Sequence, residues 1–162
     1  MKTIDNYGLK LCKYQAELFQ KSLTKTNCSS HIFIRRFMLS DLAERMDTIG
    51  FLYSSTDTTD AIVEIEYQYG PSNYGSQKMN EEALYWTGYI YRYWAYCEGK
   101  SSREVYRIIK PKELEQLYFP YHSLDPAVAI ERIKEAKGIK DVDDITRGVE
   151  ILRKVRQARR NL

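Results

Sequence analysis

The stretch EEALYWTGYIYRYWAYCE, residues 81–98, constrains the fold of this chain more than any other segment. Asn80 precedes it, two glutamates open it and Gly99 follows it, and these are the signals that begin and end an α-helix. Within it, seven of twelve consecutive positions carry aromatic rings. At about 100° per residue, apolar and aromatic side chains cover nearly the whole circumference, with Arg92 as the main exception. Such a helix belongs at the centre of a helical bundle.

Apolar residues recur at spacings of three and four along nearly all of the chain, which predicts an all-α fold. We expect about seven helices around the aromatic one. Asp41 caps a short continuation of the second helix, and Pro111 interrupts the fifth. The predicted helices cover residues 3–23, 31–47, 57–69, 81–98, 102–119, 126–137 and 141–162.

Two connecting segments have less regular patterns. Residues 48–55 (TIGFLYSS) are the only stretch compatible with a β-strand, although their glycine and serines favour a loop. Residues 120–126 (PYHSLDP) predict a rigid extended connection, because each proline disfavours helical geometry in the residue before it.

The chain length predicts one domain over residues 1–162. We divide it into an N-terminal helix and linker (1–28), a core (29–138) and a basic C-terminal helix (139–162).

The composition indicates a soluble cytoplasmic protein. Three widely spaced cysteines without a C-x-x-C pair fit a reducing compartment and lack the spacing of a zinc site. The first residues contain no apolar core of a signal peptide, and no apolar run is long enough to span a membrane. The net charge of +3 favours no particular polyanionic partner.

The aromatic helix has three interpretations. Tyr85, Tyr89, Tyr93 and Tyr96 share one stripe, and the first interpretation makes them core and helix–helix contacts. The second is a pocket that stacks a nucleobase, with Arg92 beside it for a phosphate or cation–π contact. The third is a partner interface along the edge of the tyrosine stripe. The first is favoured, because the helix is apolar on almost every side.

The sequence predicts no catalytic residue, no metal ligand and no cofactor. His31 and His122 are the only histidines available for acid–base chemistry. His122 lies near Tyr121 and Asp125, but this pattern is explained more simply by an aspartate that caps the next helix. Phosphate-binding, dinucleotide-binding and zinc-protease motifs are missing from the sequence. We therefore expect a protein that is not an enzyme.

The C-terminal helix is the strongest electrostatic feature. Arg153, Arg156 and Arg160 share a face, and Val149, Leu152 and Val155 provide an apolar one. This pattern fits a solvated terminus, and it also fits a surface for nucleic acid or for an acidic protein.

Three segments resemble a family of small bacterial proteins encoded beside an ADP-ribosyltransferase-like toxin. They are IFIRRFMLSDLAERMD, YGPSNYGSQKMNEEALYWTGYIYRYWAY and YRIIKPKELEQLYFPYHSLDPAVAIERI, and together they span about residues 30–138. The resemblance implies an antitoxin that binds and neutralises its cognate toxin by occluding the active cleft. The alternative is a nucleic-acid- or nucleotide-binding helical module that uses the tyrosine–arginine helix and the basic C-terminal helix.

Tyrosine and arginine are the side chains that contribute most often to the energetic centres of protein interfaces. On this basis we predict a partner-binding set of Tyr85, Tyr89, Arg92, Tyr93, Tyr121, His122, Arg153, Arg156 and Arg160.

Overall fold

The structure is a computed structural model that describes residues 1–53 and 57–160. For Tyr53, residues 142–144, Arg147 and Arg160, it describes the backbone alone. The described residues form α-helices and one short 3₁₀ helix, with no strand among them. The α-helices are α1 (Asn6–Lys25), α2 (Ser30–Met38), α3 (Asp41–Met46), α4 (Thr58–Tyr69), α5 (Glu81–Glu98), α6 (Ser102–Ile108), α7 (Pro111–Tyr121), α8 (Pro126–Lys137) and α9 (Val142–Arg160). The all-α prediction is confirmed.

The predicted number of about seven helices is too low, because two interruptions start new helices. Ser40 accepts a hydrogen bond from Ala43 N at 3.1 Å and so caps α3, where Asp41 was the predicted cap. Pro111 is the first residue of α7, a position where its missing N–H costs nothing. The described part of the chain therefore holds nine α-helices.

The two less regular segments also differ from expectation. Phe51–Tyr53 form the 3₁₀ helix, while residues 54 and 55 of the candidate strand lie outside the described residues. Helix α7 continues through Pro120 to Tyr121, so the predicted extended connection is shorter than residues 120–126. Pro120 lies in the last turn of this helix, where it removes a single hydrogen-bond donor.

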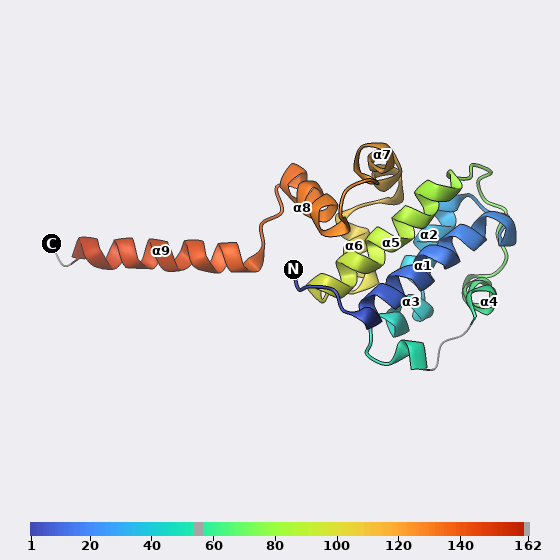
Figure 1. Ribbon diagram of the computed structural model, residues 1–162, viewed down its shortest axis with the longest axis horizontal. Coiled ribbons are helices and arrows are strands. Elements are labelled where there is room, and N and C mark those ends of the chain that lie inside the picture. The colour runs from blue at the N-terminus through green and yellow to red at the C-terminus, as the bar shows by residue number, and fades with distance from the viewer. Residues whose placement is uncertain (54–56, 161–162) are drawn as a thin grey trace. The chain divides into compact units, whose positions relative to one another are not determined.

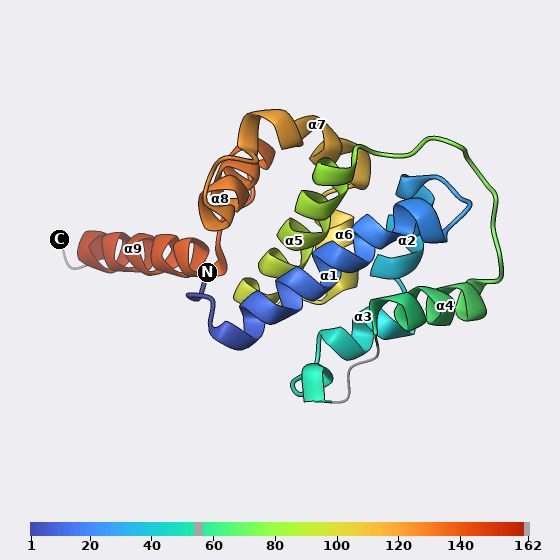
Figure 2. The ribbon, with the colours of Figure 1, turned by 45° about the vertical axis from the view of Figure 1, so that its right-hand side comes forward.

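Two compact units, residues 1–127 and residues 128–162, are described separately below. In the first unit, α1 and α5 lie side by side and pack against each other along their length (Figure 1). Helix α4 packs against α1, and α6 and α7 pack against α5. Helix α2 packs against α1, α4, α6 and α7, as the turned view also shows (Figure 2).

Helix α5 is buried on most of its surface, as its composition predicts. Twelve of its eighteen residues are buried, among them Trp94 and Tyr91. Asn80 Oδ1 accepts hydrogen bonds from the backbone N–H groups of Glu82 and Ala83 at 3.0 and 3.2 Å, and Gly99 ends the helix in a left-handed conformation. The predicted start and stop signals of this helix are confirmed.

A small aromatic cluster fills the core between α1 and α2. The Phe19 ring meets the rings of Phe33 and Phe37 edge to face, with centroids 5.8 and 5.0 Å apart. These arrangements suit the quadrupoles of aromatic rings and add to the gain from burying their area. Among the described residues, no helix has both the length and the apolar character that crossing a membrane requires.

The three cysteines are free thiols buried in the first unit. Burial raises the pKa of the Cys12 thiol from 9.0 to about 12, and burial is also the largest cause of the raised pKa of Cys97. Because the thiolate is the reactive form, a pKa of about 12 lowers the reactive fraction of Cys12 at pH 8 about a thousandfold.

We therefore expect Cys12 to resist an aromatic disulfide reagent in the native protein at pH 8. All three thiols should react once guanidinium unfolds the chain. Peptide mapping after a short exposure measures the modification of each cysteine, and rapid labelling of native Cys12 would contradict the prediction.

Candidate functional site

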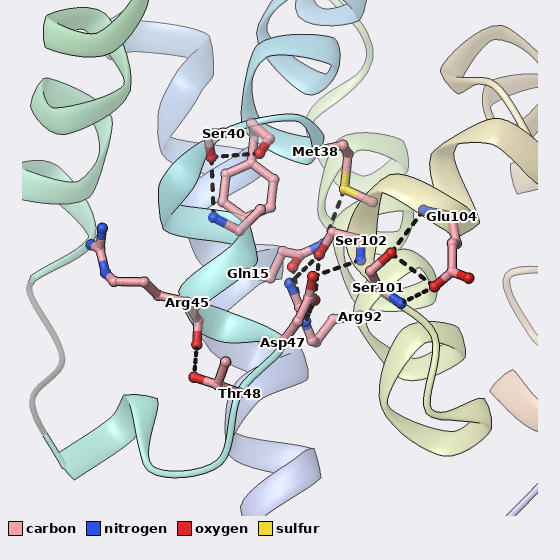
Figure 3. Close-up of polar contacts among 12 residues, drawn as sticks. Gln15, Met38, Ser40, Arg45, Asp47, Thr48, Arg92, Ser101, Ser102 and Glu104 are labelled. Carbon is pink, nitrogen blue, oxygen red and sulfur yellow. Dashed lines mark hydrogen bonds and ion pairs between the residues drawn. The ribbon is translucent and has the colours of Figure 1, made fainter.

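Arg92 lies in the core of the first unit. The sequence analysis had assigned this residue to a ligand- or partner-binding site. The Arg92 guanidinium contacts three other elements of the structure (Figure 3). Nε donates to Gln15 Oε1 at 2.8 Å, Nη1 donates to Asp47 Oδ1 at 2.7 Å and Nη2 donates to Ser102 Oγ at 2.8 Å. The side chain is only 2% exposed.

Asp47 receives hydrogen bonds from the start of α6 as well. The backbone N–H of Ser102 donates to Oδ2 at 2.8 Å, and the Ser102 hydroxyl donates to Oδ1 at 2.7 Å. Thus Arg92 on α5, Gln15 on α1, Asp47 after α3 and Ser102 on α6 form one network, the Arg92 network. All three guanidinium nitrogens of Arg92 are hydrogen-bonded within the core and the side chain is buried, so it is not on a surface that a ligand or partner could reach.

The predicted tyrosine stripe is packed along its sides. Tyr93 is buried and Tyr85 and Tyr89 are half-buried, with the rings of Tyr89 and Tyr93 stacked at a centroid distance of 6.3 Å. Burial raises the pKa of Tyr89 to about 12 and raises the pKa of Tyr85 and Tyr93 in the same direction. This arrangement agrees with the interpretation as core and helix contacts, and it leaves parts of Tyr85 and Tyr89 accessible to a partner.

Tyr121 is the last residue of α7 and His122 is its C-cap. Neither side chain forms an acid–base pair with Asp125. His122 Nδ1 lies 3.0 Å from the carbonyl oxygens of both Tyr118 and Phe119, so the N–H is on this nitrogen. Asp125 Oδ1 accepts from Ala127 N at 2.9 Å, which confirms its predicted role as a helix cap.

The other histidine, His31, is paired with an acid from a distant part of the sequence. Its Nε2 lies 2.7 Å from Glu115 Oε2, and both side chains are partly exposed. Within the described residues, no group of three or more His, Cys, Asp or Glu side chains is arranged to hold a metal ion.

In the second unit, α9 exposes apolar side chains. Ile145, Val149 and Leu152 are followed by Arg156 and Arg159 at spacings of four, three, four and three, which places all five on one side of the helix. We call these five residues the α9 face. Ile145 is 52% exposed and Leu152 is 63% exposed, and both arginines are exposed. Arg153, from the predicted set, is exposed beside this face, and the side chain of Arg160 lies outside the description.

A cleft in the first unit was missed by the sequence reasoning. It encloses about 510 Å³ and is lined by Ile32, Arg35, Arg36, Leu39, Tyr69, Ser72 and Tyr74. Ile32, Arg35 and Arg36 of α2 and its C-cap residue Leu39 have the spacing of one helix face, which is a signal that the sequence contains. No local pattern indicates that the end of α4 and the following loop would lie against that face.

The chain matches no known family model, and comparisons with curated proteins and with solved structures give no match either. Among the described residues, the α9 face is the surface that most resembles a docking site for another protein.

Proposed function

We propose that this protein binds and neutralises a toxin protein, and that it docks on the toxin through the α9 face. The observation that carries the proposal is the stripe of exposed apolar residues that ends in two arginines. The proposed toxin is ADP-ribosyltransferase-like, as the resemblance of residues 30–138 implies. Neutralisation occurs when the bound antitoxin covers the active cleft of the toxin or holds it closed.

The apolar part of the α9 face supports docking into a groove. Most of the stability of a helix in a protein comes from packing an amphipathic face against another surface rather than from the helix alone. Ile145, Val149 and Leu152 lie at the spacing by which amphipathic helices anchor in hydrophobic grooves of partner proteins. Burying these side chains on a partner would supply the missing packing energy.

The charged part of the α9 face specifies the partner further. Residues 151–160 contain five basic residues and no acidic one. A groove that accepts this helix would therefore be apolar where it meets Ile145 and Leu152 and acidic where it meets Arg156 and Arg159. Such complementarity increases the association rate and selects the orientation of the helix.

Replacing Leu152 with aspartate is expected to abolish neutralisation, because it places a carboxylate in the apolar part of the groove. The matched control is Gln157→Asp, which introduces the same side chain about 140° away around the helix. The measurement is growth of cells that express each variant together with the gene adjacent to the one that encodes this chain, which the proposal expects to encode the toxin. Size-exclusion chromatography of the two purified proteins provides the corresponding binding assay.

The results have clear consequences. Loss of rescue and of co-elution in Leu152→Asp, with both retained in Gln157→Asp, supports the proposal. Retained rescue in Leu152→Asp would show that α9 does not dock on the toxin. If the wild-type protein itself fails to protect, the antitoxin function is refuted. Circular dichroism of each variant checks that helix content is unchanged.

The basic half of α9 favours one alternative, a nucleic-acid-binding module. Contacts between basic side chains and phosphates release counterions, so affinity would fall steeply as salt increases from 50 to 200 mM, by about 10³-fold for six contacts. In that case Arg156→Ala would weaken binding and Leu152→Asp would matter less. The buried rings of Trp94 and Tyr93 offer no face for base stacking, which is why we place this function second.

A further inference from the structure

The cleft between α2 and the segment that follows α4 combines free positive charge with aromatic rings. We propose that it binds a nucleoside 5′-phosphate, with the phosphate at Arg35 and the base against Tyr74. This inference is independent of the proposed docking through α9, because the cleft shares no residue with the α9 face.

The charge of the cleft comes from two adjacent arginines with different roles. Arg36 is held in place, since Nη1 donates to the carbonyl oxygen of Gly70 at 2.7 Å and its guanidinium lies 5.6 Å from the centre of the Tyr69 ring. The Arg35 side chain is exposed and, among the described residues, makes no hydrogen bond or ion pair. A guanidinium without a partner presents a planar fork of donors that matches a phosphate group.

The electrostatic surroundings of Tyr69 are positive. Burial raises the pKa of its hydroxyl, while the charges of Arg103, Arg36 and Arg35 act in the opposite direction. The carboxylate that acts on the same hydroxyl is Asp41, which also accepts a hydrogen bond from Gln68 at 3.3 Å. The arginines near this hydroxyl, two of which line the cleft, favour an anionic ligand over a neutral one.

The remaining lining residues suit a planar ring rather than a small inorganic ion. Ile32 of α2 and the C-cap residue Leu39 add apolar surface beside the arginines, and Tyr69 and Tyr74 add two aromatic rings. Tyr74 is 74% exposed, so its ring is accessible for stacking. Stacking of a base on an aromatic side chain tolerates any base. The volume of about 510 Å³ falls within the range of about 300–1,000 Å³ that is usual for small-molecule sites.

The loop that carries Tyr74 is anchored to the start of α2 rather than free in solution. The backbone N–H groups of Ser29 and Ser30 donate to the carbonyl oxygens of Tyr74 and Gln77, both at 3.1 Å. In return, Met79 N donates to Ser30 Oγ at 2.9 Å. These contacts fix the backbone that carries Tyr74 before a ligand arrives, which lowers the entropic cost of binding.

Isothermal titration calorimetry of the full chain with AMP and UMP tests the proposal. Arg35→Ala is expected to weaken binding about tenfold or more, because it removes charge-assisted hydrogen bonds to the phosphate. Tyr74→Ala is expected to weaken it about fivefold or more, because it removes the stacking surface. Arg132→Ala and Tyr67→Ala are the matched controls, since both side chains are exposed and neither lines the cleft, and both should bind like wild type.

A phosphate and a stackable base occur both in free nucleotides and in single-stranded nucleic acid, and a short oligonucleotide distinguishes the two. If hexa-adenylate binds more than about tenfold tighter than AMP and responds to the same variants, the ligand is single-stranded nucleic acid. If AMP binds as tightly as the hexamer, the ligand is a free nucleotide. Either result supports the site. Four results would overturn it: no binding of AMP or UMP at millimolar concentration, no difference between the cleft variants and the controls, equal affinity for inorganic phosphate, or preference for phosphotyrosine.

Discussion

Replacing Asp47 with alanine is expected to lower the free energy of unfolding by about 3–5 kcal/mol, because the positive charge of Arg92 would stay buried without its counterion. The Arg92 side chain is 2% exposed and that of Asp47 is 14% exposed, so water replaces little of the lost contact. The change also removes the acceptor for the N–H and the hydroxyl of Ser102 at the start of α6. Both consequences act against the folded state.

Urea unfolding followed by tryptophan fluorescence measures this effect, since both tryptophans of the chain lie in α5. Glu64→Ala is the matched control. It removes the carboxylate of an ion pair with Arg45 at 2.7 Å whose side chains are 35% and 50% exposed, and an exposed pair contributes only about 0–1 kcal/mol. Equal losses for the two variants would contradict the assignment of Asp47 as the counterion of a buried charge.

A double variant separates the buried charge from the contacts of Asp47. Replacing Arg92 with methionine in the Asp47→Ala background removes the unpaired cation and keeps an apolar side chain of similar length. Because apolar replacement of both members of a buried ion pair is often tolerated, the double variant should recover part of the loss. If it is less stable than Asp47→Ala alone, the dominant contribution of Arg92 is its bonds to Gln15 and Ser102 rather than its charge.

Replacing Gly88 with alanine is expected to lower the free energy of unfolding by about 1–3 kcal/mol, through overpacking between α1 and α5. A Cβ atom at this position would lie 2.9 Å from the carbonyl oxygen of Gln15 and 3.0 Å from the Cα atom of Ala16. These are backbone atoms of α1, so the two helices would have to separate. Helix propensity alone predicts the opposite sign, a gain of about 1 kcal/mol.

Gly148→Ala is the matched control for this sign reversal. Gly148 also lies within a helix, α9, but a Cβ atom there would meet nothing within 4 Å. The Gly148→Ala variant should therefore show a higher helix content by circular dichroism. The Gly88→Ala variant should show a lower midpoint of unfolding by fluorescence. A Gly88→Ala variant as stable as wild type would show that α1 and α5 do not approach each other this closely.

Helix boundaries were predictable from short stretches of sequence because the signals are local. Asn80 and Gly99 limit α5 as expected, and the aspartate before Pro126 caps α8. Prediction was wrong where two signals competed over a few residues. Ser40, rather than Asp41, caps α3, and Pro120 continues α7 because a proline in the last turn interrupts only one hydrogen bond.

The candidate sites were less predictable because their members are distant in the sequence. Arg92 stood out as a charge in an apolar helix, but its counterion lies 45 residues away. The cleft residues Arg35 and Tyr74 come from different elements, and contacts that include the hydrogen bonds between the loop and the start of α2 bring them together. By contrast, the α9 face could be derived from spacing alone, since all its residues belong to one helix.

The sequence by itself determined that this protein is helical, that α5 is buried and that α9 carries apolar residues and arginines at helical spacing, because caps and periodicity act within a few residues. Only the tertiary structure decided that Arg92 is a core residue and that Arg35 faces a cleft. Whether a charged side chain is buried and paired depends on which side chains from other helices lie next to it, and the sequence around that residue does not specify them.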